Sequence, residues 1–239
     1  MITVYTITYN EELLIQFMID HYRSRFPNCH IVVYDNKSTD NTVNIAVKNG
    51  CEIRGYESNN SLNDRIHMDI KNTCWVNAQT DWVLMCDLDE LLDINDEELK
   101  QEESIGTTII KTEAWTMINM EDNFDIKNIT CGYRDGGYDK SLLFNKKFIQ
   151  SINYGAGCHD CHPVGIIKHS DKSYPIHHFM LINPEHFIAK CKVTQQRLSE
   201  ENKKNNWGYQ VQKSEDILKA DFEMLRARAR TQNTPLRRK

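Results

Sequence analysis

The chain has 239 residues, of which 40% are hydrophobic and 26% are charged, and its formal net charge at pH 7 is −5. A chain of this length buries a core without disulfide staples, and its composition is that of a globular protein, neither disordered nor membrane-spanning. The negative charge argues against a nucleic-acid binder, because such proteins gain affinity by neutralising phosphates.

The N-terminal stretch MITVYTITYNEELL has no basic segment, no long apolar run and no small-residue cleavage site of the kind found in secretory signals. No apolar run is long enough for a transmembrane segment. We therefore expect a protein of the cytosol, or one that faces it, which is not secreted. Its eight cysteines are then expected to be reduced core residues.

The C-terminus is basic, since no acidic residue follows Glu223. The basic residues there are Arg226, Arg228, Arg230, Arg237, Arg238 and Lys239. Such a tail allows peripheral contact with an anionic surface, although a solvated helix end and a frayed terminus are the favoured explanation.

The first hundred residues alternate between strand-like and helix-like patterns. Strands are expected at 2–8, 30–35, 51–57 and 82–86. Helices are expected from the Asn10 cap to Pro27, from the Ser38 turn to Gly50, and over 63–79. This order predicts a Rossmann-like α/β fold, with a mostly parallel sheet and helices on both faces. The glycine motifs of dinucleotide and P-loop sites are absent.

After Gly106 the rhythm changes to short strand candidates separated by turns. These candidates lie at 107–118, 129–133, 140–144 and 148–152, and helices follow near 184–200 and 209–229. The pattern predicts a mixed or antiparallel extension of the sheet and C-terminal helices. We expect one domain over 1–239, with a nucleotide-binding lobe at 1–105, an acceptor lobe at 106–183 and C-terminal helices at 184–239.

Four acidic residues follow the strand in the stretch TDWVLMCDLDELLD, at 80–93. Alternate residues of an extended backbone point to the same side, so Asp87 and Asp89 face one point beyond the carboxyl end of the strand. Two carboxylates together with substrate phosphates commonly hold Mg²⁺, and Mn²⁺ accepts the same oxygens. The alternative is an acidic helix start, a role we expect for Glu90 and Asp93.

Two other polar motifs follow neighbouring strands, TYNEE at 8–12 and YDNKSTDNT at 34–42, before CDLDE at 86–90. In this order and spacing, the three motifs resemble the nucleotide-sugar-dependent glycosyltransferases of the GT-A fold, in particular the family-2-like branch. The resemblance covers roughly residues 1 to 95. It implies a metal-dependent transfer of a hexosyl-type sugar from a nucleoside diphosphate, with a UDP-sugar favoured, to a glycan or other hydroxyl acceptor, in an inverting reaction.

The resemblance also implies roles for individual residues. The donor nucleotide would be contacted by Tyr9, Asn10, Glu11, Asp35, Asp64, Arg65, Asn72 and Lys140. Mn²⁺ or Mg²⁺ would be held by Asp87, Asp89 and the late histidine of the family, for which His178 fits better than His177.

The general base is less clearly indicated, because the usual Glu-Asp pair of the family is missing at the expected place. Asp160, after a glycine-containing turn, is the first choice and His159 the second, while Asp135 and Asp139 remain open.

Three other interpretations compete. The stretch CHDCH at 158–162 has zinc-like spacing, but no second ligand pair is evident. DLDEL approximates the acidic motif of haloacid-dehalogenase-type phosphatases, except that it ends the fourth strand and has Leu91 at its fifth position. A non-catalytic scaffold subunit that binds sugar nucleotides is the third.

Overall fold

The structure, a computed structural model, describes residues 1–121, 125–208, 211–232 and 234–235. Its N-terminal half contains β1 (Ile2–Thr8), α1 (Ile15–Arg25), β2 (His30–Asp35), α2 (Thr42–Lys48), β3 (Glu52–Gly55), α3 (Asp64–Thr73), β4 (Trp82–Asp87), β5 (Glu90–Leu92) and α4 (Asp96–Ser104). There follow β6 (Ile109–Ile118), β7 (Cys131–Arg134), β8 (Leu143–Asn145), β9 (Ile149–Ser151), β10 (Val164–Gly165), β11 (His169–Leu181), α5 (Pro184–Arg197), α6 (Glu200–Lys204), α7 (Glu215–Gln232) and β12 (Thr234–Pro235).

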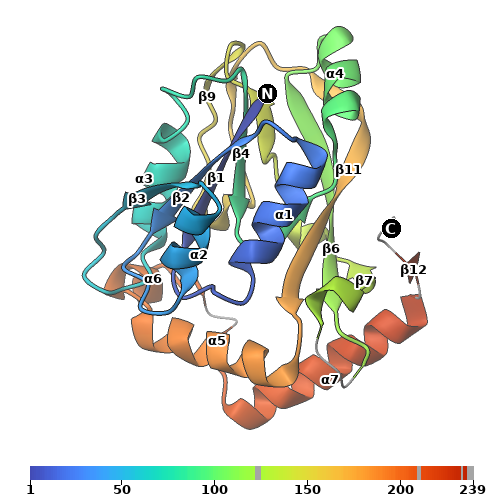
Figure 1. Ribbon diagram of the computed structural model, residues 1–239. Coiled ribbons are helices and arrows are strands. Elements are labelled where there is room, and N and C mark those ends of the chain that lie inside the picture. Colours follow the sequence, from blue (N-terminus) through green and yellow to red (C-terminus); the bar gives the residue numbers. More distant parts are fainter. Residues whose placement is uncertain (122–124, 209–210, 233, 236–239) are drawn as a thin grey trace.

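One sheet runs through both halves of the chain (Figure 1). Its strand order is β12-β7-β6-β8-β4-β1-β2-β3, and β3, β2, β1 and β4 are parallel neighbours. Beyond β4 the sheet continues with antiparallel β8, and β11 pairs with both β6 and β5. The predicted parallel half with a mixed extension is therefore confirmed.

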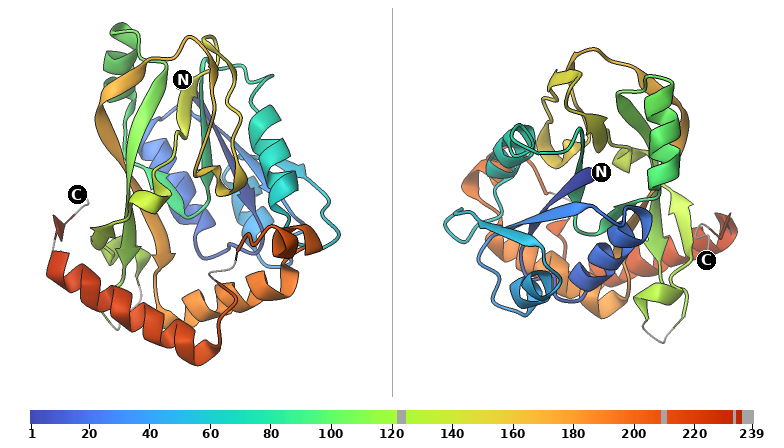
Figure 2. Two further views of the ribbon diagram at one scale, coloured as in Figure 1. Left: turned by 180° about the vertical axis from the view of Figure 1, so that it is seen from behind. Right: turned by 45° about the horizontal axis from the view of Figure 1, so that its top comes forward.

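The two faces of the parallel strands carry different apolar clusters, because successive side chains point to opposite sides. Val4 and Leu84 belong to the cluster on the side of α1 and α2. Tyr5 and Met85, one residue further along each strand, join Trp75 in the other cluster. Seen from behind, α3 covers this second face (Figure 2).

The expected helix start after the acidic motif is wrong. Glu90 begins strand β5, which pairs antiparallel with β11. Asp93 instead forms an ion pair with Arg25 at 2.6 Å. The next helix, α4, begins at Asp96 behind Asn95, whose side chain and that of Glu98 form a capping box.

At the end of the molecule opposite the N-terminus, α5 and α7 run beneath the sheet (Figure 1). They pack through Phe187 and Phe222, which share a cluster with Ile118 and Leu181 at the ends of β6 and β11. The parallel strands end toward α5, so this helix covers the edge at which open α/β sheets bind ligands.

Two findings bear on the remaining expectations. No helix in the described ranges is long and apolar enough to cross a membrane. Of the basic residues near the C-terminus, Arg226 donates to the Met120 carbonyl at 2.7 Å and Arg228 lies over the Tyr133 ring at 4.4 Å. These two side chains contact the protein itself, and Arg237, Arg238 and Lys239 lie outside the described residues.

Candidate active site

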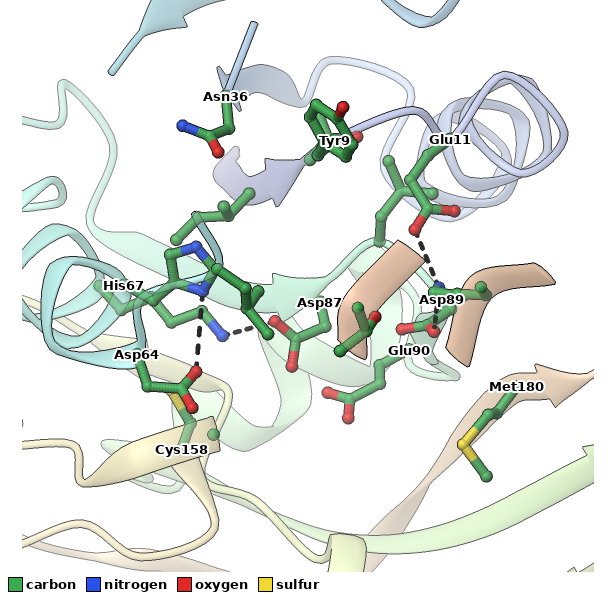
Figure 3. Close-up of a pocket in the computed structure, with 18 of the residues that line it drawn as sticks. Tyr9, Glu11, Asn36, Asp64, His67, Asp87, Asp89, Glu90, Cys158 and Met180 are labelled. Atoms are coloured by element: carbon green, nitrogen blue, oxygen red, sulfur yellow. Dashed lines mark hydrogen bonds and ion pairs between the residues drawn. The ribbon is translucent and has the colours of Figure 1, made fainter. Parts of the chain in front are cut away.

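A cavity of about 470 Å³ opens at the carboxyl ends of β1 and β4. The acidic motif lines its floor, α3 forms one wall and α5 forms another. Figure 3 shows Asp87, Asp89 and Glu90 turned into this space, between Asp64 on one side and Glu11 on the other.

Strand register explains why these side chains meet. β1 and β4 pair in parallel with Ile7 opposite Asp87, so TYNEE and CDLDE leave the sheet side by side. On the other side, β5 pairs with β11 so that Glu90 lies opposite His178. The Phe179 amide also donates to the Asp89 carbonyl at 2.7 Å, which fixes the turn between the two aspartates against β11.

Asp87 is held by two lysines. The Lys71 ammonium lies 2.5 Å from its Oδ1, and the Lys140 ammonium lies 3.0 Å from its Oδ2. Lys140 also contacts Glu90 Oε1 at 2.5 Å, and both of these side chains are 2% exposed. Burial would raise the pKa of Asp87, but Lys140 and Lys71 outweigh it and hold that pKa well below its usual value.

Asp89 has a different set of neighbours. Its Oδ2 lies 2.9 Å from the Lys190 ammonium and 3.8 Å from His178 Nε2. Lys190 also contacts Glu11 Oε1 at 2.9 Å, so one ammonium bridges two carboxylates. Burial opposes ionisation, but Lys190 and His178 lower the pKa of Asp89 to about 2. For Glu11 burial prevails, and its pKa is raised.

The far end of the cavity is aromatic and polar. The Arg197 guanidinium lies 3.2 Å from the centroid of the Tyr9 ring, and it also donates to Asn36 Oδ1. Nearby, the Tyr56 hydroxyl lies 2.8 Å from His67 Nε2. A flat ring, a guanidinium and an amide are groups that stack on or hydrogen-bond to a nucleobase.

The segment that carries the candidate bases forms a short 3-10 turn at Ala156–Cys158. His159 lines the cavity beside the Tyr138 ring, with 5.3 Å between the ring centroids. Gly157 has a φ of 66°, and a Cβ there would lie 2.6 Å from His159 Cδ2, so only glycine leaves room for this ring. Burial lowers the pKa of His159, which favours the neutral imidazole.

Most of the predicted site residues meet at the cavity. They are Tyr9, Asn10, Glu11, Asp64, Asp87, Asp89, Lys140, His159 and His178. Asn10 lies at a φ of 54° and its side chain accepts a hydrogen bond from the Thr39 amide, so it joins the ends of β1 and β2. The helix cap expected at Asn10 is wrong, since α1 begins at Ile15. Ser38 likewise does not cap α2 but accepts from the Asn10 amide at 2.9 Å.

Four predicted site residues lie outside the cavity lining. Asp35 is buried and accepts from the Ser38 amide, and Asn72 exchanges hydrogen bonds with the Tyr154 backbone. Arg65 pairs with Glu201 on the surface, at 3.2 Å. The side chain of Asp160 is 64% exposed and faces His162, 3.8 Å away. In this structure these residues form turns or surface contacts. The sequence placed them near the site, but it does not determine the direction in which each side chain points.

Sequence reasoning predicted Lys140 but missed three other cations of the site, Lys71, Lys190 and Arg197. Lys71 appeared as one residue of a helix, and α5 was assigned no role in the site. A signal was present on α5, where His186, Lys190 and Arg197 recur at helical spacing and all line the cavity.

The side chains permit a test of whether a divalent ion fits. No group of three or more His, Cys, Asp or Glu side chains placed to hold a metal is found among the residues that the structure describes. Mg²⁺ and its diphosphate, however, need only one or two protein carboxylates, and two atoms that share such an ion at about 2.1 Å lie within about 4.2 Å of each other. Asp89 Oδ2 and His178 Nε2 meet this limit at 3.8 Å.

Unpaired buried atoms also favour a bound cation at this place. Glu11 Oε2, Glu90 Oε2 and His178 Nδ1 have no hydrogen-bond partner among the described residues. Asp89 and His178 therefore meet the distance limit for sharing a divalent ion, whereas both oxygens of Asp87 are paired with lysines in this structure.

Comparison with protein families matches residues 3–99 to the family described as "Glycosyl transferase family 2". Comparison with curated protein sequences returns no match.

Among solved structures, the mannosyltransferase PcManGT from Pyrobaculum calidifontis, in complex with GDP-Man and Mn²⁺, is similar with a TM-score of 0.47 and 14% identity, covering 98% of this chain and 76% of that one. S. aureus TarS 1–349 is similar with a TM-score of 0.46 and 16% identity, covering 97% and 73%. Of a longer TarS structure this chain covers 38%. At such TM-scores the likeness supports no further argument.

Proposed function

We propose that this chain, whose residues 3–99 match glycosyl transferase family 2, transfers a sugar from a nucleoside diphosphate to a hydroxyl acceptor, with a divalent ion and inversion at the anomeric carbon. The observation that carries the proposal is the cavity in which Asp89, His178 and Glu11 meet beyond the ends of β1 and β4. The aromatic end at Tyr9 and Arg197 would take the base, and a UDP-sugar is the donor we favour.

The acidic end would take the diphosphate. Asp89 and His178 would hold Mn²⁺ or Mg²⁺, which when bound supplies positive charge to the leaving diphosphate. Lys140 and Lys71 keep Asp87 ionised and fixed against the end of β4. Lys71, Lys140 and Lys190 all line this cavity, where negative charge would develop as the glycosidic bond to phosphate breaks.

His159 is the general base that this geometry favours over Asp160. Its neutral imidazole would take the proton of the acceptor hydroxyl as the hydroxyl oxygen bonds to the anomeric carbon and the diphosphate leaves. Asp160 is largely exposed and outside the cavity lining. The acceptor would enter on this side, between His159 and Tyr138.

A thermal-shift panel of UDP-, GDP- and dTDP-sugars, with and without Mn²⁺, tests the proposal, because a ligand of the native state raises the melting temperature with its saturation. We expect one donor class to raise Tm, and to raise it further with Mn²⁺. Asp89→Asn should lose the Mn²⁺-dependent part and at least about a hundredfold in transfer rate. Asp93→Asn, in the same motif but paired with Arg25, is the control and should keep both.

The outcomes separate the alternatives. Donor binding without any transfer or donor hydrolysis would favour the scaffold, and phosphate release from a monoester would favour the phosphatase. No response to any sugar nucleotide, or an Asp89→Asn variant equal to wild type, would contradict the proposal.

A further inference from the structure

Helix α5 presents one face to the cavity. The lining residues from this helix are His186, Ala189, Lys190, Val193, Thr194 and Arg197. Their spacing of three and four residues puts them on one side of the helix. Lys190 lies at the acidic end and Arg197 at the aromatic end, so the helix spans the length of the candidate donor site.

Lys190 contacts the oxygen of Asp89 that would bind a metal ion. Its ammonium contacts Asp89 Oδ2, the same atom that faces His178 Nε2. The side chain of Asp89 is 13% exposed and that of Glu11 12% exposed, so the lysine is the partner of two largely buried carboxylates. An ammonium and a divalent ion cannot both occupy the space between Asp89 and His178, because like charges at that distance repel strongly.

We infer that Lys190 is a metal-competing residue: in the free protein it neutralises Asp89 and Glu11, and a divalent ion binds Asp89 only when the ammonium has left it. This inference rests on the proposed function. The donor diphosphate is the anion to which the displaced ammonium would turn. Nucleotide and metal should therefore bind with strong positive coupling, and the metal alone should bind weakly.

Removal of the ammonium tests the inference without measuring activity. Binding of Mn²⁺ is followed by the loss of the free-ion EPR signal, in the absence and in the presence of UDP. In Lys190→Gln, Asp89 and Glu11 face each other without a cation, so Mn²⁺ alone should bind roughly tenfold tighter than to wild type. The factor by which UDP enhances Mn²⁺ binding should fall correspondingly, because part of that factor comes from displacing Lys190.

Two further variants control for charge and for folding. Lys192→Gln removes a lysine two residues away that pairs with Glu215 at 2.6 Å outside the cavity, and it should behave as wild type. Lys190→Arg keeps the positive charge and should keep Mn²⁺ binding weak. As a second readout, Mn²⁺ without UDP should raise Tm more in Lys190→Gln than in wild type, since the ion restores a lost partner.

The outcomes distinguish this inference from the proposed function. If wild type binds UDP and Mn²⁺ together but Lys190→Gln binds Mn²⁺ alone no tighter, the inference is overturned and the proposed function stands. If none of the proteins binds Mn²⁺ under any condition, both fall.

Discussion

Asp87 and Asp89 are two residues apart and have opposite surroundings. Both oxygens of Asp87 are paired with lysines, Lys71 from α3 and Lys140 from the segment before β8. In Asp89 a single oxygen, Oδ2, lies near both Lys190 and His178. Both aspartates therefore contact lysines, and Asp89 differs from Asp87 in also lying near an imidazole, at 3.8 Å. We propose that Asp89 is a metal ligand once Lys190 has left it, and that Asp87 is a positioning residue.

The choice of general base is a residue-scale question with a direct test. His159→Gln should lower the transfer rate by about a hundredfold or more, the usual contribution of a general base, while Asp160→Asn should stay within a few-fold of wild type. Both rates are measured at saturating donor and acceptor. A loss in Asp160→Asn with an intact His159→Gln would reverse the assignment.

The same residue predicts a pH dependence of the rate. The base must be neutral, and burial lowers the pKa of His159 below its usual 6.5. The rate should thus be constant through pH 7 and decline only as the pH falls below 6.5. This acid limb should be absent from the residual activity of His159→Gln.

At the scale of elements, the stability of α5 affects the candidate site, because residues of this helix line the cavity. Asn183 caps this helix by accepting from the His186 amide at 2.7 Å, and Pro184 follows at the first helical position. The helix carries both Lys190 and Arg197, so the cap positions the contacts at both ends of the cavity. We therefore expect the stability of this helix and the affinity for the proposed donor to be linked.

Asn183→Ala should lower the free energy of unfolding by about 1 kcal/mol, the usual effect of losing a cap, and should also raise the KM for the donor. Asn95→Ala removes the cap of α4, which lies away from the cavity, and should cost a similar free energy with an unchanged KM. Urea unfolding and donor titration measure the two quantities. Equal KM values in both variants would refute the link.

At the scale of the whole molecule, one sheet joins the two halves of the chain. β8 pairs with β4 and β6, and β11 pairs with β5 and β6, so the second half contributes His178 and Lys140 to a site whose acids come from the first. Residues of both halves line the cavity, so we expect loss of packing along this sheet to weaken the site as well.

Buried histidines make the fold sensitive to acid. His21 on α1 is 4% exposed and lies 2.9 Å from the Leu92 carbonyl, and burial lowers its pKa to about 3. The unfolded chain, with a pKa near 6.5, therefore binds a proton that the folded protein excludes. The stabilising effect of the neutral ring is complete above pH 6.5 and is lost as the pH falls toward the folded value.

Between pH 7 and pH 5 this single group should lower the free energy of unfolding by on the order of 2 kcal/mol. His21→Gln should show a correspondingly flatter dependence in urea unfolding at the two pH values. His30→Gln, on the exposed side of β2, is the control and should follow wild type. A His21→Gln curve parallel to wild type would contradict the assignment.

Much of this architecture is predictable from the sequence because its causes are local. Alternation of apolar residues in β1, β2 and β4, with capped helices between them, specifies parallel strands, and parallel strands bring their carboxyl ends to one edge. That reasoning alone placed Tyr9, Glu11 and Asp89 together. It failed after Asp89, where Glu90 and Asp93 suggested a helix start but a partner strand, β11, recruited Glu90 into β5.

The amino-acid sequence is therefore enough to predict where the negative charge gathers. The cations that neutralise this charge depend on the three-dimensional fold, since Lys71, Lys140 and Lys190 are 16, 53 and 101 residues from the aspartates they contact. Ion pairing depends on distance through space, and no local pattern of residues encodes that distance. The direction of a side chain in a turn likewise depends on the surrounding fold, and here His159, and not Asp160, lines the cavity.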